Sequence, residues 1–262
     1  MLRALQFEPP PQRPEPDALP PAALREQCLE RARTYRLVAG VFAEEPSAQF
    51  LAALRAPEAL GALGEAGLRF DADFTAPQLD ALVESLATEY ATLFVASGGF
   101  PPVESVRLTG RYYQEPHFSV KAAYRDAGFE AHGERFQVFD DQLGVELMFV
   151  AELLERAACA LADQDTPAYL RAERDIKRFW ALHLGRWVRG YASLVQRATE
   201  HSFYREMAKL LDAFASDEIE RMRLRVDDVD GGRQVVPKSE VQVLFNPDEP
   251  VCNACPGARA SG

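Results

Sequence analysis

Apolar residues recur every three or four positions along most of the chain, which is the spacing of one face of a helix. The clearest case is residues 140–161, where one stripe is formed by Leu143, Leu147, Val150, Leu154 and Leu161. Similar patterns predict further helices at residues 22–43, 46–55, 57–68, 77–94, 117–128, 167–198 and 202–225. Because no alternating pattern of useful length precedes residue 224, the sequence predicts an all-α fold of about ten helices.

Both ends of the chain and one internal segment break this pattern. Residues 1–21 are rich in proline and are expected to form a disordered arm. Residues 226–262 are polar, with several glycines and prolines, and are expected to form a flexible tail. Residues 95–116 contain two glycines and two prolines near their start and are expected to form a loop, for which a proline-stiffened turn and a functional role are equally favoured. A single helical domain then spans residues 22–225.

Two polar residues fall inside apolar stripes. Glu146 lies within the stripe described above, and His183 interrupts the stripe of the helix expected at residues 167–198. Burying a carboxylate is costly unless the group is paired or protonated, so Glu146 needs a partner such as His183 or Arg186. For both residues, a structural polar contact in the core is favoured over a functional role.

The overall charge narrows the classes of partner. The chain has 262 residues, with 29 Lys and Arg against 40 Asp and Glu, and a formal net charge of -11. No basic stripe of the kind that binds nucleic acid is visible, and the acidic balance favours a cationic partner. No apolar run has membrane-spanning length, and the first residues lack the apolar core of a secretory signal. We therefore expect a cytoplasmic protein without a nucleic-acid partner or a membrane span.

Signatures of common enzymes are missing from the sequence. It has no GxSxG, P-loop, GxGxxG or HExxH motif, and its four histidines are too far apart for a helical metal site. We therefore expect neither catalysis nor a bound cofactor. Cys252 and Cys255, in CNACP, have the spacing of two zinc or iron–sulfur ligands, but a tetrahedral site needs four. Reduced, idle thiols in a flexible tail are favoured over a metal site.

Five stretches of the sequence occur in an order and spacing that resemble one protein family. They are RARTYRLVAGVFAEEP, EYATLFV, PPVESV, FDDQLGVELMFVAEL and FWALHLGRWV. Together they resemble the TorD/DmsD family of cytoplasmic chaperones for molybdoenzymes, over about residues 25–222. The resemblance implies an all-helical protein that is not an enzyme. It also implies binding of the twin-arginine signal peptide and apo form of a molybdoenzyme catalytic subunit, which assists cofactor insertion and prevents premature export.

The resemblance also suggests residues that contact this client. The family's Asp-His pair falls on Asp141 and Gln142, so the aspartate is kept and the histidine is not. Glu146 and His183 match the family's helix patterns, as structural polar residues. With the loop and the helix before it included, the expected client-binding residues are Pro102, Glu104, Ser105, Asp141, Gln142, Tyr90 and Phe94.

A binder of twin arginines needs exposed carboxylates beside an apolar surface, because charge-assisted hydrogen bonds fix the guanidinium groups. Asp141 is expected at the exposed start of its helix and Glu104 in the loop, where both would meet these arginines. The main alternative is a helical metal or redox protein acting through Cys252 and Cys255. A third hypothesis is a helical enzyme with an unrecognised site. The protein is expected to be a monomer or a homodimer.

Overall fold

A computed structural model describes residues 19–129 and 139–241. Short turns η1 (Ala91–Val95, π-helical) and η2 (Leu184–Arg186, 3-10) interrupt the helices. The helices are α1 (Pro21–Ala43), α2 (Ala48–Leu54), α3 (Pro57–Glu65), α4 (Ala72–Thr75), α5 (Leu79–Tyr90), α6 (Glu104–Thr109), α7 (Glu115–Asp126), α8 (Leu143–Ala162), α9 (Thr166–Leu182), α10 (Val188–Ala198) and α11 (Ser202–Arg221). The described residues contain no strand, so the all-α prediction is confirmed.

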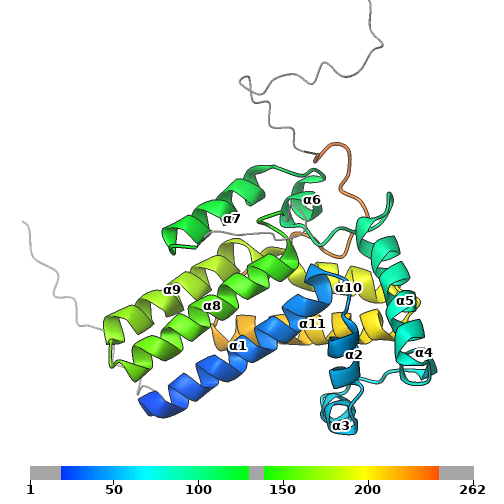
Figure 1. Cartoon of the computed structure of the whole chain (residues 1–262). Helices are drawn as coiled ribbons and strands as arrows, with labels where there is room; N and C mark the ends of the chain where they lie inside the picture. The colour runs from blue at the N-terminus through cyan, green and yellow to red at the C-terminus, as the bar shows by residue number, and fades with distance from the viewer. Residues whose placement is uncertain (1–18, 130–138, 242–262) are drawn as a thin grey trace, which may run out of the picture.

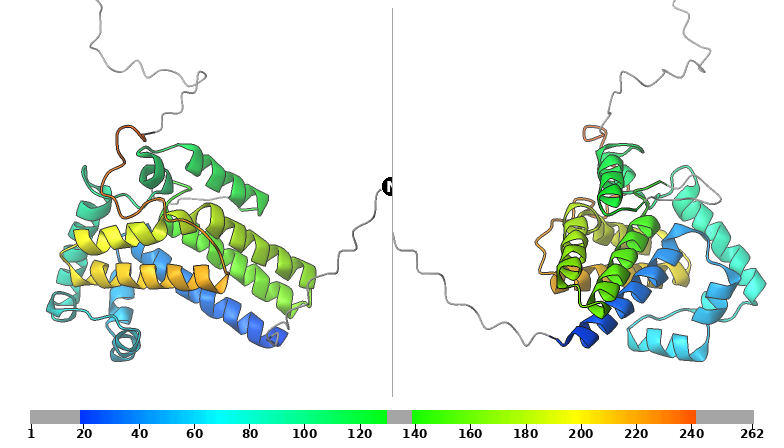
Figure 2. Two further views of the ribbon diagram at one scale, coloured as in Figure 1. Left: turned by 180° about the vertical axis from the view of Figure 1, so that it is seen from behind. Right: turned by 60° about the vertical axis from the view of Figure 1, so that its left-hand side comes forward.

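The long helices form the centre of the molecule. Helices α1, α8 and α9 lie side by side, and α10 and α11 pack together as a hairpin beside them (Figure 1). Helices α2 to α5 cover one end, while α6 and α7 form a cap over α8 and α9 (Figures 1 and 2). The largest fully buried side chains are Trp180, Trp187, Tyr35, Tyr191 and Tyr204.

The contact between α1 and α8 depends on a glycine in the first turn of α8. A Cβ atom at Gly144 would lie 2.5 Å from the Cβ of Ala43, at the end of α1. Because no side chain fits in that space, the two backbones can approach closely only with glycine at this position. This crossing fixes the start of α8, where the segment that precedes it meets α6.

The helix expected at residues 167–198 is broken in two. Helix α9 ends at Leu182, His183 leaves the helical region with φ −126° and ψ −97°, and α10 begins at Val188. A Cβ atom at Gly185 would lie 2.6 Å from the carbonyl oxygen of Trp180, so the turn is compact enough to require glycine there. The expectation of one continuous helix was therefore wrong, and the break places His183 and Trp187 beside α6 and α8.

The segment expected to be a loop contains a helix of its own. Residues 95–116 include α6, whose first turn is bonded to the chain just before α8. The Glu104 amide donates to the carbonyl oxygen of Asp141 (2.9 Å), and the Leu143 amide donates to that of Pro102 (2.8 Å). These two bonds form a fixed junction between distant parts of the chain.

Part of the expected flexible tail packs on the helices. The Arg107 Nε atom lies 2.7 Å from the Asp230 carboxylate, and both side chains are buried. The Val229 amide donates to the carbonyl oxygen of Arg186 (2.7 Å), and the Arg197 guanidinium donates to that of Gly232 (2.6 Å). The expectation that residues 226–241 lack fixed structure is corrected by these contacts.

Two further expectations concern other parts of the chain. The pair Cys252 and Cys255 and most of the proline-rich arm lie outside the described residues. Among the helices that the structure describes, none combines the length and apolar character needed to cross a membrane.

Candidate functional site

Three carboxylates lie completely buried where α6, α7, α8 and the end of α9 meet. They are Glu104, Asp141 and Glu146, each with none of its surface exposed. Two histidines, His117 from α7 and His183 from the end of α9, are buried beside them. We call these five residues the acid–histidine cluster. Burial of so many ionisable groups is costly unless they are bonded to one another, so the bonds within the cluster decide its role.

Asp141 holds the cap to the rest of the molecule. One carboxylate oxygen accepts from the Ser105 amide (2.8 Å) in the first turn of α6, and the other lies 2.9 Å from His117 Nδ1. The Nε2 atom of His117 faces Asp140 at 3.6 Å. Asp141 was expected to be exposed at the start of its helix, where it would meet an arginine of the client. The expected exposure was wrong, because Gln142 caps α8 and Asp141 instead is buried and binds the start of α6.

Glu104 is joined to α9 through His183. Its Oε2 atom lies 3.0 Å from His183 Nδ1, while His183 Nε2 lies 3.5 Å from the Ser119 hydroxyl of α7. Burial raises the pKa of the Glu104 carboxyl, an effect that His183 partly offsets. His183 is buried, as its position in an apolar stripe predicted, whereas Glu104 was expected to be exposed and its carboxylate is enclosed in the molecule.

Glu146 is buried, as its position in the apolar stripe predicted. The expected partners were wrong: His183 pairs with Glu104, and the Arg186 guanidinium reaches the carbonyl oxygen of Leu182. Burial raises the pKa of Glu146 well above its ordinary value, and the negative charges of Glu104 and Asp141 add to the shift.

The remaining expected client-binding residues also lie inside the molecule. The side-chain amide of Gln142 donates from Nε2 to the carbonyl oxygen of Phe42 (2.6 Å), at the end of α1. The Tyr90 hydroxyl lies 3.4 Å from the same oxygen. Phe94 packs edge-on against Phe42 and Tyr90. Pro102 and Ser105 are buried in the α6 junction. None of these residues presents a surface in this conformation.

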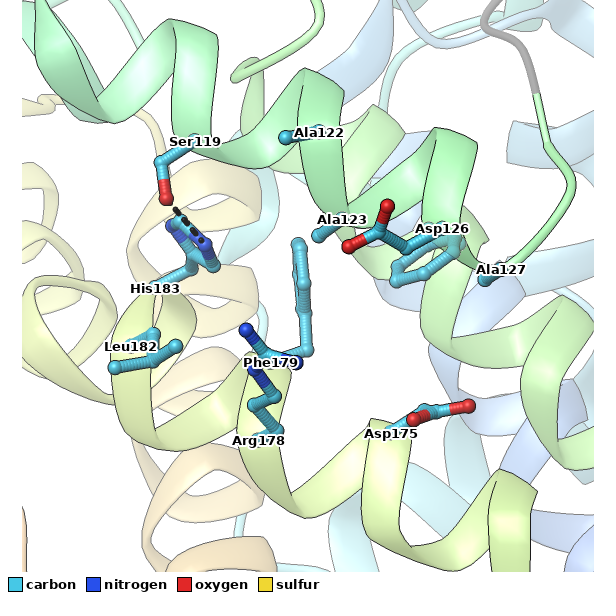
Figure 3. A pocket seen from close by; sticks show the side chains of 11 residues that line it. Ser119, Ala122, Ala123, Asp126, Ala127, Asp175, Arg178, Phe179, Leu182 and His183 are labelled. Atoms are coloured by element: carbon cyan, nitrogen blue, oxygen red, sulfur yellow. Dashed lines mark hydrogen bonds between the residues drawn. The ribbon is translucent and has the colours of Figure 1, made fainter.

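A groove lies on the other side of α7, where this helix faces α9. It encloses about 140 Å³ and is lined by small side chains of α7, such as Ala122 and Ala123, with Phe179 of α9 and Phe149 of α8. Figure 3 shows Ser119, Leu182 and His183 at one end and Asp126 and Asp175 at the other. We call this the α7–α9 groove. His183 belongs both to its wall and to the acid–histidine cluster.

Asp126 and Asp175 differ from the buried acids in their surroundings. Both are exposed, and neither pairs with a cation in the described part of the chain. Arg178 of α9 also lines the groove and is likewise without an acidic partner there. Sequence reasoning missed all three, because a charged residue on the outer face of a helix carries no signal that distinguishes it from ordinary solvated surface.

The described residues contain no group of three or more His, Cys, Asp and Glu side chains placed to hold a metal ion. The acid–histidine cluster is thus held by pairs, with each histidine bound to one principal carboxylate.

Comparison with known protein families shows the family to which the chain belongs. Residues 53–193 match the model of the nitrate reductase delta subunit family, which is more than half of the chain. The chain belongs to the nitrate reductase delta subunit family. The match runs from the end of α2 into α10, so it includes both the acid–histidine cluster and the α7–α9 groove.

Membership of the nitrate reductase delta subunit family confirms the resemblance to the TorD/DmsD chaperones. The family comprises maturation chaperones of molybdoenzymes, which are assembly factors rather than catalysts. No curated protein matches the sequence.

Proposed function

We propose that the protein binds the twin-arginine signal peptide and apo form of a molybdoenzyme catalytic subunit. It assists cofactor insertion and prevents premature export of this client. The signal peptide binds in the α7–α9 groove. The observation that carries the proposal is the pair of exposed, unpaired carboxylates, Asp126 and Asp175, at one end of a groove with mixed polar and apolar walls.

The two halves of the groove match the two halves of such a peptide. Arginine guanidinium groups form charge-assisted hydrogen bonds with carboxylates, which supply geometric specificity. The apolar segment that follows the arginines in a signal peptide gains affinity from burial against Ala122 and Ala123, which are half-buried in the groove wall. The Leu182 end of the groove extends this apolar surface, since Leu182 is 47% exposed.

The buried acids do not fit this task in the conformation described. Asp141 and Glu104 are enclosed, and each is bound by a histidine. To reach an arginine, either acid would have to leave its histidine and move into solvent. The histidine would then be buried without its carboxylate partner. We therefore assign these acids to support of the cap, and the contact with the client to the groove.

Isothermal titration with a synthetic twin-arginine signal peptide tests the site. Asp126→Asn combined with Asp175→Asn should weaken binding by about tenfold and reduce its dependence on salt, because two charge-assisted bonds are lost. The matched control is Asp163→Asn combined with Asp217→Asn, which removes the same charge from exposed positions that do not line the groove. This control should bind like the wild type.

Arg178 supplies a test of the opposite sign. Its guanidinium lies in the groove and repels those of the peptide, so Arg178→Ala should strengthen binding. A wild-type protein that does not distinguish the twin-arginine peptide from a scrambled one would refute the proposed function. Specific binding that neither aspartate pair affects would keep the function and move the site elsewhere.

A further inference from the structure

Four buried polar atoms without a hydrogen bond of ordinary geometry gather at the centre of the acid–histidine cluster. They are Glu104 Oε1, both carboxyl oxygens of Glu146 and the indole nitrogen of Trp187. Buried polar groups in proteins are nearly always bonded, so four such atoms at one point call for a physical explanation. Glu104 and Trp187 are also the two side chains that lie near enough to the Glu146 carboxyl to influence it through hydrogen bonding.

The charges at this point explain the arrangement. Glu104, Asp141 and Glu146 would carry three negative charges if all were ionised. The histidines His117 and His183 supply at most two positive charges. When both histidines are charged, one additional proton makes the cluster electrically neutral, and neutrality is strongly favoured where water is excluded.

We propose that Glu146 and Glu104 share one proton, and that this shared proton latches the cap of α6 and α7 onto α8 and α9. The protonated Glu146 carboxyl donates its O–H to Glu104 Oε1, and its other oxygen accepts from the Trp187 N–H. Glu104 Oε2 keeps the N–H of His183. All four atoms then have partners, and the bonds join α6, α8 and the α9–α10 turn.

Loss of the proton to solvent opens the latch. Glu146 and Glu104 then repel each other across two different elements, and α6 is the one with fewer residues packed in the core. Helix α7 follows α6 and touches α9 through Ser119 and His183, so separation of the cap also widens the α7–α9 groove. This inference does not depend on what binds in the groove.

Several other charged or titratable groups surround the shared proton and set the conditions under which it leaves. They come from every element packed around the cluster: Tyr112 and His117 on the cap, Tyr124 of α7, Asp140 and Asp141 before α8, His183 after α9 and Arg186 of η2. The tyrosines remain neutral over the relevant range because burial or a nearby carboxylate raises their pKa values.

Infrared spectroscopy of the full chain tests for the proton directly. At neutral pH, the wild type should show the C=O stretching band of a buried carboxylic acid, and the band should fade as the pH rises. Glu146→Gln should abolish it, because glutamine has the shape of the protonated acid without a titrating group. Glu152→Gln, a half-buried acid on the same helix whose carboxylate pairs with Arg36 instead of the cluster, is the matched control and should leave the band unchanged.

Hydrogen exchange tests the latch itself. The exchange rates of the wild-type α6 and α7 amides are first corrected for the intrinsic effect of pH. The equilibrium constant for opening of the cap should then increase by up to about tenfold per pH unit, over the pH range in which opening releases the proton. In Glu146→Gln, opening should be independent of pH. If that variant folds poorly, the wild-type titrations alone still decide the question. No acid band at neutral pH, or pH-independent opening of the wild-type cap, would overturn the proposal; peptide binding is not an arm of this test.

Discussion

Where α7 meets α6 and α8, Asp141 and Glu104 are completely buried and each is bound by a histidine. Where the same helix faces α9, Asp126 and Asp175 are exposed and have no cationic partner among the described residues. The first pair lies in motifs that resemble those of the TorD/DmsD family, whereas the second lies in no motif. Asp141 and Glu104 are bonded within the fold, whereas Asp126 and Asp175 are not.

The difference follows from the cost of desolvation. A buried carboxylate is retained only if neighbours satisfy it, so its bonds are already committed in the folded protein. An exposed carboxylate is still hydrated and has no protein partner. It can therefore form its full set of hydrogen bonds with the guanidinium group of a ligand. Substitutions in the two groups should therefore have opposite consequences for stability and for binding, and this contrast can be tested in order of expected size.

The largest effect is expected from Asp141→Ala. The change leaves the Ser105 amide and His117 without their buried acceptor, and removal of one partner from a buried pair typically costs about 3–5 kcal/mol. Unfolding by urea, followed by circular dichroism, measures the loss. Asp141→Asn should fall between this variant and the wild type, because asparagine keeps an oxygen for Ser105. A loss under 1 kcal/mol for the alanine variant would place Asp141 among the dispensable surface acids.

A buried acid in the last described segment should behave in the same way. Ending the chain after residue 225 removes both partners of the Arg107 guanidinium in this segment, the Asp230 carboxylate and the Arg233 carbonyl oxygen, at an expected cost of about 3 kcal/mol in unfolding free energy. Ending it after Val241 keeps this pair and is the matched control. Thermal melts of both truncated chains would separate the two contributions. Equal losses would show that the Arg107–Asp230 pair is not what stabilises this segment.

The contrast also explains which parts of the structure could be predicted from the sequence. The apolar stripes predicted most helices, and they predicted the burial of Glu146, because a stripe is a property of one helix. The partners of Glu146 and Asp141 could not be found in this way. Asp141 binds Ser105 of a different helix, and no periodicity within one segment records such a contact.

The apolar pattern also failed to predict the break between α9 and α10 and the packing of non-helical residues on the helices. The apolar spacing continues across His183, so it gave no sign that α9 ends there and that Gly185 permits a sharp turn. Residues 226–241 have the composition of a flexible tail, but one buried ion pair, between Arg107 and Asp230, helps to hold them. Asp126 and Asp175 became candidates only when the fold placed them at one end of a groove.

Stability should fall as the pH rises, because of Glu146. Burial raises its folded-state pKa, so the folded protein holds a proton that the unfolded chain releases above its ordinary pKa of about 4.3. The contribution is complete below that value and is lost by up to about 1.4 kcal/mol per pH unit as the pH approaches the folded-state pKa. Denaturation midpoints across this range measure the slope. Glu146→Gln should remove this component, and an unchanged slope would assign it to another group.

The smallest effect is expected at the exposed acids. Asp126 ends α7, where the negative end of the helix dipole disfavours a carboxylate, so Asp126→Asn should raise the free energy of unfolding by at most about 0.5 kcal/mol. Asp80 supplies the matched control, because it lies in the first turn of α5, where the dipole favours it, and Asp80→Asn should lower stability by a similar amount. Melting temperatures at low salt would resolve the two signs. If Asp126→Asn instead destabilised the protein by as much as a buried acid, Asp126 would have a structural partner, and the groove would lose one of the two carboxylates proposed to bind the client.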